Sequence, residues 1–499
     1  MDWKARMLQP KTWRLLLNLS CFLAVCSAGF VFAAETTVSH RTALDDYIAK
    51  PDSTYSWRLA ETKEAADHTM FAIELTSQTW RSPEEVDRTV WKHWLMVVRP
   101  KDVVSKTGFL FIGGGSHRDT PPEGVEGYMV KMAVATKSVV VELKNVPNQP
   151  LEFKGGGRKM VEDDLITFTW NKFIETKDKE WPARLPMVKS AVRAMDALQA
   201  FAPTKECGNL TLDNFVVAGG SKRGWTTWCT AAVDPRVVAI CPAVIDVLNV
   251  RKSMRNHLEA YGFWAPSVGD YVRGGLVMKE NDPGYIELLE IEDPYVYRER
   301  YTMPKLVLNA AGDQFFTPDS SRLYFHDLPG EKLLRYVPNT DHSLRGSDGI
   351  ETLAAFYDSI IRNLKRPKYT WKFPEDGAIR VETADQPKEV KLWQGHNPNA
   401  RDFRLEEVGP IYTSVPVKEI EPGIYVGKIE SPKAGYTAFF VELTYDIGSS
   451  FPMKVTTDVR VLPEVFPFKG IAPTQKLGGA KLLEAEMRRR EQEKAQNKK

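Results

Sequence analysis

The sequence predicts an α/β fold with a mostly parallel sheet, antiparallel strands at its N-terminal edge and a C-terminal β-rich domain. Short apolar runs alternate with stretches of helical period between residues 100 and 365, which is typical of a parallel sheet covered on both faces. Meandering strand patterns precede this region, between residues 54 and 100, and such strands commonly edge a parallel sheet. Alternating apolar and polar residues follow it, between residues 369 and 465, and this pattern indicates a small antiparallel β-sandwich.

The N-terminus has the pattern of an export signal. Basic residues precede an apolar run from Leu15 to Phe32, which ends in Val31-Phe32-Ala33. Because signal peptidase accepts Val and Ala at these positions, we expect residues 1–33 to be a signal peptide and the mature chain to be periplasmic or secreted. An uncleaved membrane anchor is the alternative, since the apolar run is close to the ~20 residues that span a bilayer.

The remaining elements are predicted in chain order. We expect strands at 55–59, 68–75, 89–98, 108–112, 138–143, 215–218, 237–247, 305–309 and 332–337, and helices at 126–137, 185–201, from about 222, and at 349–364. Residues 40–368 are therefore predicted to form the α/β domain, with a cap insertion at about 248–302. A β-rich domain at 369–466 and a charged, disordered tail at 475–499 follow.

A candidate nucleophile lies where one buried strand ends. The run Asn214-Phe-Val-Val-Ala-Gly-Gly-Ser-Lys-Arg-Gly-Trp-Thr226 is typical of a strand, a tight turn at Ser221 and a helix, which is the layout of a nucleophile elbow. The usual pattern is G-x-S-x-G, but Arg223 occupies the last place and Gly224 follows it. An ordinary strand-to-helix loop has the same appearance, so the surroundings must decide.

Two further loops supply a candidate acid and base. Asp313 follows the strand at 305–309, and His342 follows the strand at 332–337. In an open α/β sheet these loops meet at one edge, in the chain order Ser, acid, His. His342 would take the proton of Ser221 while Asp313 orients the imidazole. Asp246 and, less favourably, Asp341 are alternative acids.

The amides of Lys222 and Gly114 are the predicted oxyanion hole. Lys222 follows the nucleophile, and Gly113-Gly114-Gly115 follows an early strand, as in the glycine loops of lipases; a plain flexible turn is the alternative. Lys222 and Arg223 can bring positive charge that suits a carboxylate-bearing substrate, although Arg223 is equally well explained as a structural ion-pair partner. Trp225 and Trp264 are candidates for contact with substrate, and packing is the alternative for aromatic residues of the cap.

Composition excludes several classes of function. The formal net charge is +2, and the basic residues form no stripe that nucleic acid would need. No Cys/His cluster has metal-ligand spacing, so we expect neither metal nor cofactor.

Removal of the leader leaves Cys207, Cys229 and Cys241, which allows one disulfide with Cys207 as a partner. The expected partner is a small-molecule or peptide substrate, and contact with a membrane is expected only through an uncleaved leader.

Six motifs resemble one family. These are Ser77-Gln-Thr-Trp80, Val90-Trp-Lys-His-Trp94, Gly219-Gly-Ser-Lys-Arg-Gly-Trp225, Ile245-Asp-Val-Leu-Asn249, Gly312-Asp-Gln-Phe-Phe-Thr-Pro-Asp-Ser320 and Pro338-Asn-Thr-Asp-His342. They are similar to motifs of the PhoPQ-activated pathogenicity-related proteins, from about Ala43 to Phe466. The resemblance implies an α/β-hydrolase fold and a triad at Ser221, Asp313 and His342. The elbow also resembles those of prolyl-oligopeptidase-type peptidases and glucuronoyl esterases.

The sequence thus favours an exported serine hydrolase that cleaves an ester or an amide. The C-terminal β-domain and the cap fit a peptidase, whereas the cationic turn fits an esterase. A non-catalytic secreted binding or signalling protein on the same scaffold is the rival hypothesis, since fold does not imply function.

Overall fold

The computed structural model describes residues 41–479, which from Thr42 onward form one compact unit. The predicted signal peptide and most of the predicted tail lie outside the described residues. Within 41–479, no helix combines the length and the apolar character that crossing a bilayer requires.

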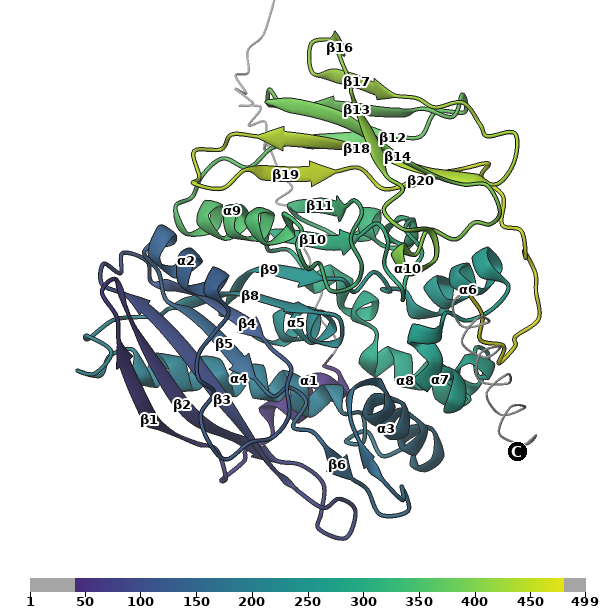
Figure 1. Ribbon diagram of the computed structural model, residues 1–499. Coiled ribbons are helices and arrows are strands. Elements are labelled where there is room, and N and C mark those ends of the chain that lie inside the picture. The colour runs from purple at the N-terminus through teal and green to yellow at the C-terminus, as the bar shows by residue number, and fades with distance from the viewer. Residues whose placement is uncertain (1–40, 480–499) are drawn as a thin grey trace, which may run out of the picture. The chain divides into compact units, whose positions relative to one another are not determined.

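A nine-stranded sheet with the order β1-β2-β3-β5-β4-β8-β9-β10-β11 forms the centre of the fold (Figure 1). Its strands are β1 (Ser56–Glu64), β2 (His68–Thr79), β3 (Val90–Pro100), β4 (Thr107–Ile112), β5 (Val140–Lys144), β8 (Asn214–Gly220), β9 (Val237–Ala243), β10 (Lys305–Ala310) and β11 (Lys332–Val337). The pairs β1-β2, β2-β3 and β3-β5 are antiparallel. The pairs β5-β4, β4-β8, β8-β9, β9-β10 and β10-β11 are parallel. This arrangement confirms the predicted α/β-hydrolase fold.

Helices cover both faces of the sheet. α4 (Arg184–Phe201) and α5 (Lys222–Val233) pack together, with α1 (Ala43–Ala49) beside them, whereas α2 (Gly127–Thr136) and α9 (Gly349–Ile361) pack together on the opposite face (Figure 1). In α9 the buried Leu353, Phe356 and Tyr357 recur at helical spacing, so this helix presents one apolar face to the sheet.

The cap lies between β9 and β10 and is helical throughout. Its elements are α6 (Val250–Tyr261), η1 (Pro266–Val268), α7 (Gly269–Arg273), η2 (Leu276–Met278), α8 (Pro283–Glu292) and η3 (Pro294–Arg300). Helix α3 (Glu162–Thr176), which follows the short strands β6 (Leu151–Glu152) and β7 (Lys159–Met160), packs against α7 and α8. The sequence analysis missed α1 and α3, although the acidic first turn of α3 is a recognisable start signal.

One predicted strand was too long. β9 ends at Ala243 and not at Val247, because Val244 has a φ of 44° and turns the chain out of the sheet. The consequence is that Asp246 lies in a loop beyond the strand.

Two antiparallel sheets form the C-terminal region. One contains β12 (Tyr369–Lys372), β13 (Ile379–Thr383), β16 (Glu419–Glu421) and β17 (Ile424–Gly427); the other contains β14 (Glu389–Asn397), β15 (Thr413–Pro416), β18 (Tyr436–Tyr445), β19 (Met453–Thr456) and β20 (Arg460–Leu462). Val381 of one sheet and Leu392 and Val441 of the other share a single apolar core, as the predicted sandwich requires.

The C-terminal region also packs on the loops that follow β10 and β11. The Leu405 amide, at the start of α10 (Leu405–Val408), donates to the Gly312 carbonyl at 2.9 Å. The Tyr336 amide of β11 donates to Thr456 Oγ1 at 2.9 Å, and Arg335 pairs with the buried Glu442. These contacts hold the two loops that carry the predicted acid and base.

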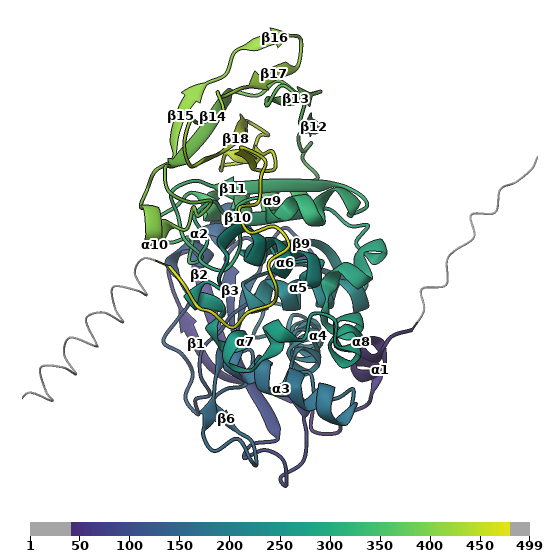
Figure 2. The same ribbon diagram turned by 90° about the vertical axis from the view of Figure 1, so that its right-hand side faces the viewer.

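After β20 the chain returns to the cap (Figures 1 and 2). The Phe468 amide donates to the Glu259 carbonyl of α6 at 3.0 Å, and the Trp264 amide donates to the Lys476 carbonyl at 2.8 Å. The Trp264 indole donates to the Thr474 carbonyl at 2.6 Å. We call residues 464–479 the C-terminal strap.

The three described cysteines, Cys207, Cys229 and Cys241, are buried free thiols. The disulfide with Cys207 that the sequence allowed is therefore not formed.

Candidate active site

Ser221 lies at a sharp turn between β8 and α5. Its φ of 56° and ψ of −128° place it in a region that L-residues rarely occupy. The Ser221 amide donates to the Ala243 carbonyl of the neighbouring strand at 2.9 Å. The turn thus lifts the Ser221 hydroxyl above the carboxyl edge of the sheet, as in a nucleophile elbow.

Two glycines allow this turn to close. A Cβ on Gly219 would lie 2.7 Å from the Arg223 carbonyl oxygen, and a Cβ on Gly224 would lie 2.9 Å from the carbonyl oxygens of both Ala243 and Gly219. Helix α5 therefore approaches β8 and β9 most closely at Gly224 and not at Arg223. This contact explains why Arg223 can stand where G-x-S-x-G has its last glycine.

Asp313 and His342 meet at the ends of β10 and β11. His342 Nδ1 lies 2.8 Å from Asp313 Oδ2 and 3.0 Å from Oδ1, and the His342 amide donates to Gln314 Oε1 at 2.9 Å. The buried Nε2 of His342 has no hydrogen-bond partner among residues 41–479. With Nδ1 held as the donor, Nε2 is the ring nitrogen left to accept a proton.

The rings of Phe315 and Phe316 link this pair to Ser221. Their centroids lie 4.3 Å and 6.0 Å from the His342 ring. Both phenylalanines also line a cavity that Ser221 itself lines. Ser221 follows β8, and Asp313 and His342 follow β10 and β11, so all three lie beyond the carboxyl ends of parallel strands of one sheet, with β9 between the first and the other two.

The two alternative acids have other partners. Asp246 is buried and accepts hydrogen bonds from Tyr324, at 2.7 Å, and from Tyr336. Burial raises the pKa of Asp246 well above its usual range, against the two tyrosine hydrogen bonds that lower it. Asp341 accepts from the amide and hydroxyl of Ser343, at 2.9 and 2.6 Å, within its own turn.

The amides predicted for the oxyanion hole flank the elbow. Lys222 is the first residue of α5, so its N–H has no intrahelical acceptor and lies at the positive end of the helix dipole. Gly114 follows β4, and its carbonyl accepts from the Asn145 amide at 2.7 Å. A Cβ on Gly114 would lie 2.9 Å from Arg223 Nη2, so this loop rests directly on the Arg223 guanidinium.

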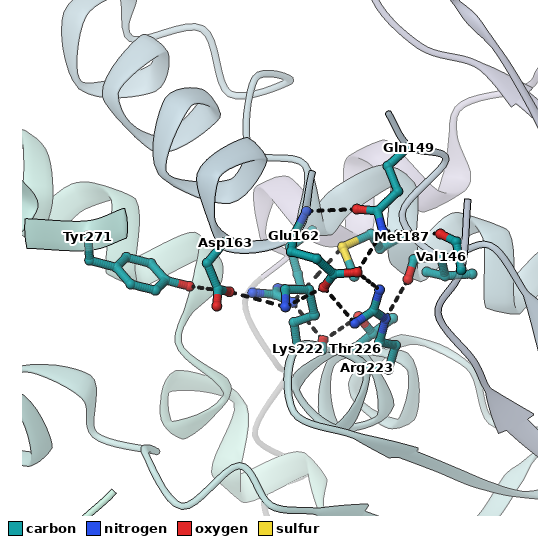
Figure 3. A network of polar contacts seen from close by, with 11 residues as sticks. Val146, Gln149, Glu162, Asp163, Met187, Lys222, Arg223, Thr226 and Tyr271 are labelled. Carbon is teal, nitrogen blue, oxygen red and sulfur yellow. Dashed lines mark hydrogen bonds and ion pairs between the residues drawn. The ribbon is translucent and has the colours of Figure 1, made fainter. Parts of the chain in front are cut away.

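The charges of Lys222 and Arg223 are compensated within the protein (Figure 3). Arg223 Nη1 and Nη2 lie 2.8 and 2.7 Å from the two carboxylate oxygens of Glu162, and Lys222 Nζ lies 2.6 Å from Glu162 and 3.2 Å from Asp163. Burial opposes ionisation of Glu162, but Arg223 and Lys222 outweigh it and hold the pKa of this carboxyl far below its usual range. Of the two roles considered for Arg223, the structure shows the ion pair.

The same network reaches the glycine loop (Figure 3). Gln149 Nε2 donates to Glu162 at 2.6 Å and to the Gly115 carbonyl at 3.1 Å, while Arg223 Nε donates to the Val146 carbonyl at 2.5 Å. Glu162 has a φ of 52°, in the left-handed region. The backbone is therefore strained at the residue whose carboxylate binds Arg223, Lys222 and Gln149. Sequence reasoning missed Glu162 and Asp163 because it missed α3, and it missed Gln149 because this residue lies in a loop before β6 that has no recognisable motif.

A cavity of about 80 Å³ adjoins Ser221 under the cap. Most of its wall is apolar and includes Trp170, Trp225, Trp264, Leu276, Tyr285 and Phe316. Trp225 donates its indole N–H to the Glu292 carbonyl at 2.5 Å and packs edge-on against Trp170, with ring centroids 5.9 Å apart. Trp225 and Trp264 thus pack in the fold and also line the cavity; their contact with substrate stays a prediction.

Comparison with known proteins gives one family and one close relative. The model of the PhoPQ-activated pathogenicity-related protein family matches residues 44–404. The autocrine proliferation repressor protein A of Dictyostelium discoideum is 38% identical over 456 residues, which are 86% of this chain and 92% of that protein.

Solved structures resemble the chain more distantly. An acetyl xylan esterase from Thermoanaerobacterium sp. JW/SL YS485 has a TM-score of 0.46 at 15% identity, over 64% of this chain and 91% of that one. An acylaminoacyl peptidase from Pyrococcus horikoshii has a TM-score of 0.37 at 15% identity, over 64% of this chain and 44% of that one.

Proposed function

Since the chain belongs to the PhoPQ-activated pathogenicity-related protein family and has the α/β-hydrolase fold, we propose that it is an exported serine hydrolase that cleaves an ester or an amide through an acyl-enzyme. The observation that carries the proposal is the pairing of His342 Nδ1 with Asp313, which leaves the buried Nε2 without a partner among residues 41–479. Export is inferred from the sequence of residues 1–33 alone.

In the proposed reaction Ser221 Oγ attacks the substrate carbonyl carbon while His342 Nε2 takes the hydroxyl proton. Asp313 stabilises the imidazolium that results. The amides of Lys222 and Gly114 bind the oxyanion, and the oxygen or nitrogen of the leaving group departs with the proton from His342. Water then attacks the acyl-enzyme, with His342 as its base, and releases the acid and the free Ser221 hydroxyl.

Asp313 is the acid that the geometry favours over Asp246. Both oxygens of Asp313 face His342, whereas both oxygens of Asp246 are engaged by tyrosines. Burial also raises the pKa of Asp246 and so disfavours the charged form that would stabilise an imidazolium.

The test is labelling of the mature protein with a fluorophosphonate probe, beside Ser221→Ala and His342→Ala. Labelling of the wild type that both variants lose supports an activated serine. Absence of labelling of well-folded wild type contradicts the proposal.

A second candidate function is signalling through binding alone. It is favoured by the relative of 38% identity, which is named for the repression of proliferation. Because a hydrolase scaffold can be kept without its chemistry, the same labelling experiment separates the two: a well-folded wild-type protein of this second kind would not label at Ser221.

A further inference from the structure

The cavity beside Ser221 has an apolar wall built from separate segments of the chain. Trp170 comes from α3, Trp225 from α5, Trp264 and Leu276 from the cap, and Phe316 from the loop after β10. Because these segments lie far apart in sequence, the cavity exists only in the folded chain. Its wall favours an uncharged ligand.

Charged groups at the cavity are already paired with one another. Lys222 Nζ, whose side chain is only 7% exposed, lies between Glu162 and Asp163, and Asp163 also accepts from the Tyr271 hydroxyl at 3.1 Å. At the rim, Arg255 Nε donates to Glu280 at 3.1 Å.

Arg251 also lines the cavity, but its partners are neutral: it donates to the Glu280 carbonyl and to Asn281 Oδ1, each at 3.0 Å. At Lys222 and Arg255, a ligand carboxylate would have to break an existing ion pair before it gained a cation, and burying an unpaired charge is costly.

The position of His342 shows which part of a substrate the cavity can hold. The leaving group must depart beside His342 Nε2, because that nitrogen protonates it. Among the described residues, the cavity wall includes Ser221 and Lys222 but does not include His342. The cavity is therefore on the side of the group that stays attached to Ser221, which is the acyl group.

We infer that this cavity binds a short, uncharged aliphatic acyl group; the inference rests on the proposed hydrolase function and names its substrate class. A cavity of about 150 Å³ holds the six carbons of a benzene ring, so a cavity of about 80 Å³ has room in proportion for about three carbons, which is the propyl chain of a butyryl group. The positive charge of Lys222 and Arg223 positions the elbow and the glycine loop and does not bind substrate.

The test compares p-nitrophenyl esters of four acids on the full mature protein: acetate, butyrate, decanoate and monosuccinate. Butyrate is expected to exceed acetate in kcat/KM by at least about tenfold, because two more methylenes are buried. Monosuccinate places a carboxylate where butyrate ends in a methyl group, and its kcat/KM is expected to be about 100-fold below that of butyrate. Decanoate is expected to be slower than butyrate because it exceeds the cavity.

Val277→Phe fills the cavity from η2, since Val277 lines it and is only partly buried. This variant is expected to lower the butyrate-to-acetate ratio by at least about tenfold. Val104→Phe is the matched control, because Val104 is 74% exposed in a loop away from the site, and it should leave the ratio unchanged.

The outcomes separate the two proposals. If Ser221 labels with the fluorophosphonate but acetate or monosuccinate is the preferred ester, the acyl-group inference is wrong and the hydrolase function stands. If Ser221 does not label and no ester is cleaved, the hydrolase function is wrong and the inference falls with it.

Discussion

The two halves of the candidate site differ in what holds them in place. At the ends of β10 and β11, polar groups meet in one hydrogen-bonded geometry, in which His342 Nδ1 faces both oxygens of Asp313. Under the cap, the cavity wall is held by packing among rings such as Trp170 and Trp225. The first, which we call the polar half, can supply proton transfer. The second, which we call the cap half, can supply selection by size. Changes in the two halves should therefore have different signatures.

The largest expected effect is on the reaction itself. Ser221→Ala and His342→Ala should each lower kcat for a reactive ester by at least about 10⁴-fold, because the proposed nucleophile and base act as a unit. Steady-state and burst kinetics measure this loss, with circular dichroism to confirm folding. A loss of less than tenfold in either variant would show that the polar half does not perform the chemistry.

The two buried carboxylates sharpen the comparison. Asp313→Asn should lower kcat by about 10³- to 10⁴-fold, because an amide cannot stabilise the imidazolium or hold its tautomer. Asp246→Asn should stay within about fivefold of wild type, because the two oxygens of Asp246 accept hydrogen bonds from Tyr324 and Tyr336 and not from His342. The reverse order of effects in kinetics would make Asp246 the acid.

The cap half should lose stability as pH rises. Burial raises the pKa of Asp293 to about 6, against backbone hydrogen bonds from Tyr295, Val250 and Asn249 that lower it. A carboxyl whose folded pKa exceeds its unfolded value contributes stability below about pH 4 and loses it as pH rises through 6.

Urea unfolding of wild type and Asp293→Asn tests this effect. The free energy of unfolding of wild type, relative to the variant, should fall by about 2 kcal/mol between pH 4 and pH 7. A difference that does not change with pH would mean that Asp293 keeps an ordinary pKa in the folded protein.

The network beside the elbow should respond to pH in the opposite direction, with a smaller effect. The pKa of Glu162 is lowered in the folded protein, so its contribution is present above the unfolded pKa of about 4.3 and is lost as pH falls. Because the side chain is 38% exposed, solvent screening limits the loss in Glu162→Gln to about 1–2 kcal/mol at pH 7. Thermal unfolding at pH 7 and pH 3 measures it, because the contribution is lost only as pH falls well below about 4.3; equal losses at both pH values would contradict the ion-pair interpretation.

The polar half could be predicted from sequence because its residues follow strands. Ser221, Asp313 and His342 each come directly after an apolar run, and the parallel sheet brings such positions to one edge. Asp246 stays open in the sequence as an alternative to the preferred Asp313, since the tyrosines that enclose it, Tyr324 and Tyr336, lie about 80 and 90 residues away in the chain.

The cavity and the ion-pair network could not be predicted, since both depend on contacts between distant segments. Trp170 and Glu162 belong to α3, whose mixed composition gave no clear period, and they meet α5 only through the fold. The Gly-Asp-Gln-Phe-Phe motif did contain Phe315 and Phe316, so two residues of the wall stood beside the predicted acid. Their packing on the His342 ring required the structure.

The C-terminal strap has a consequence for truncation of the chain. Pro473 lines the cavity, and the Thr474 and Lys476 carbonyls accept hydrogen bonds from Trp264. Part of the cavity wall is thus supplied by residues about 210 positions beyond the cap tryptophan that they hold. Loss of the strap would open the cavity without removing any strand of the nine-stranded sheet.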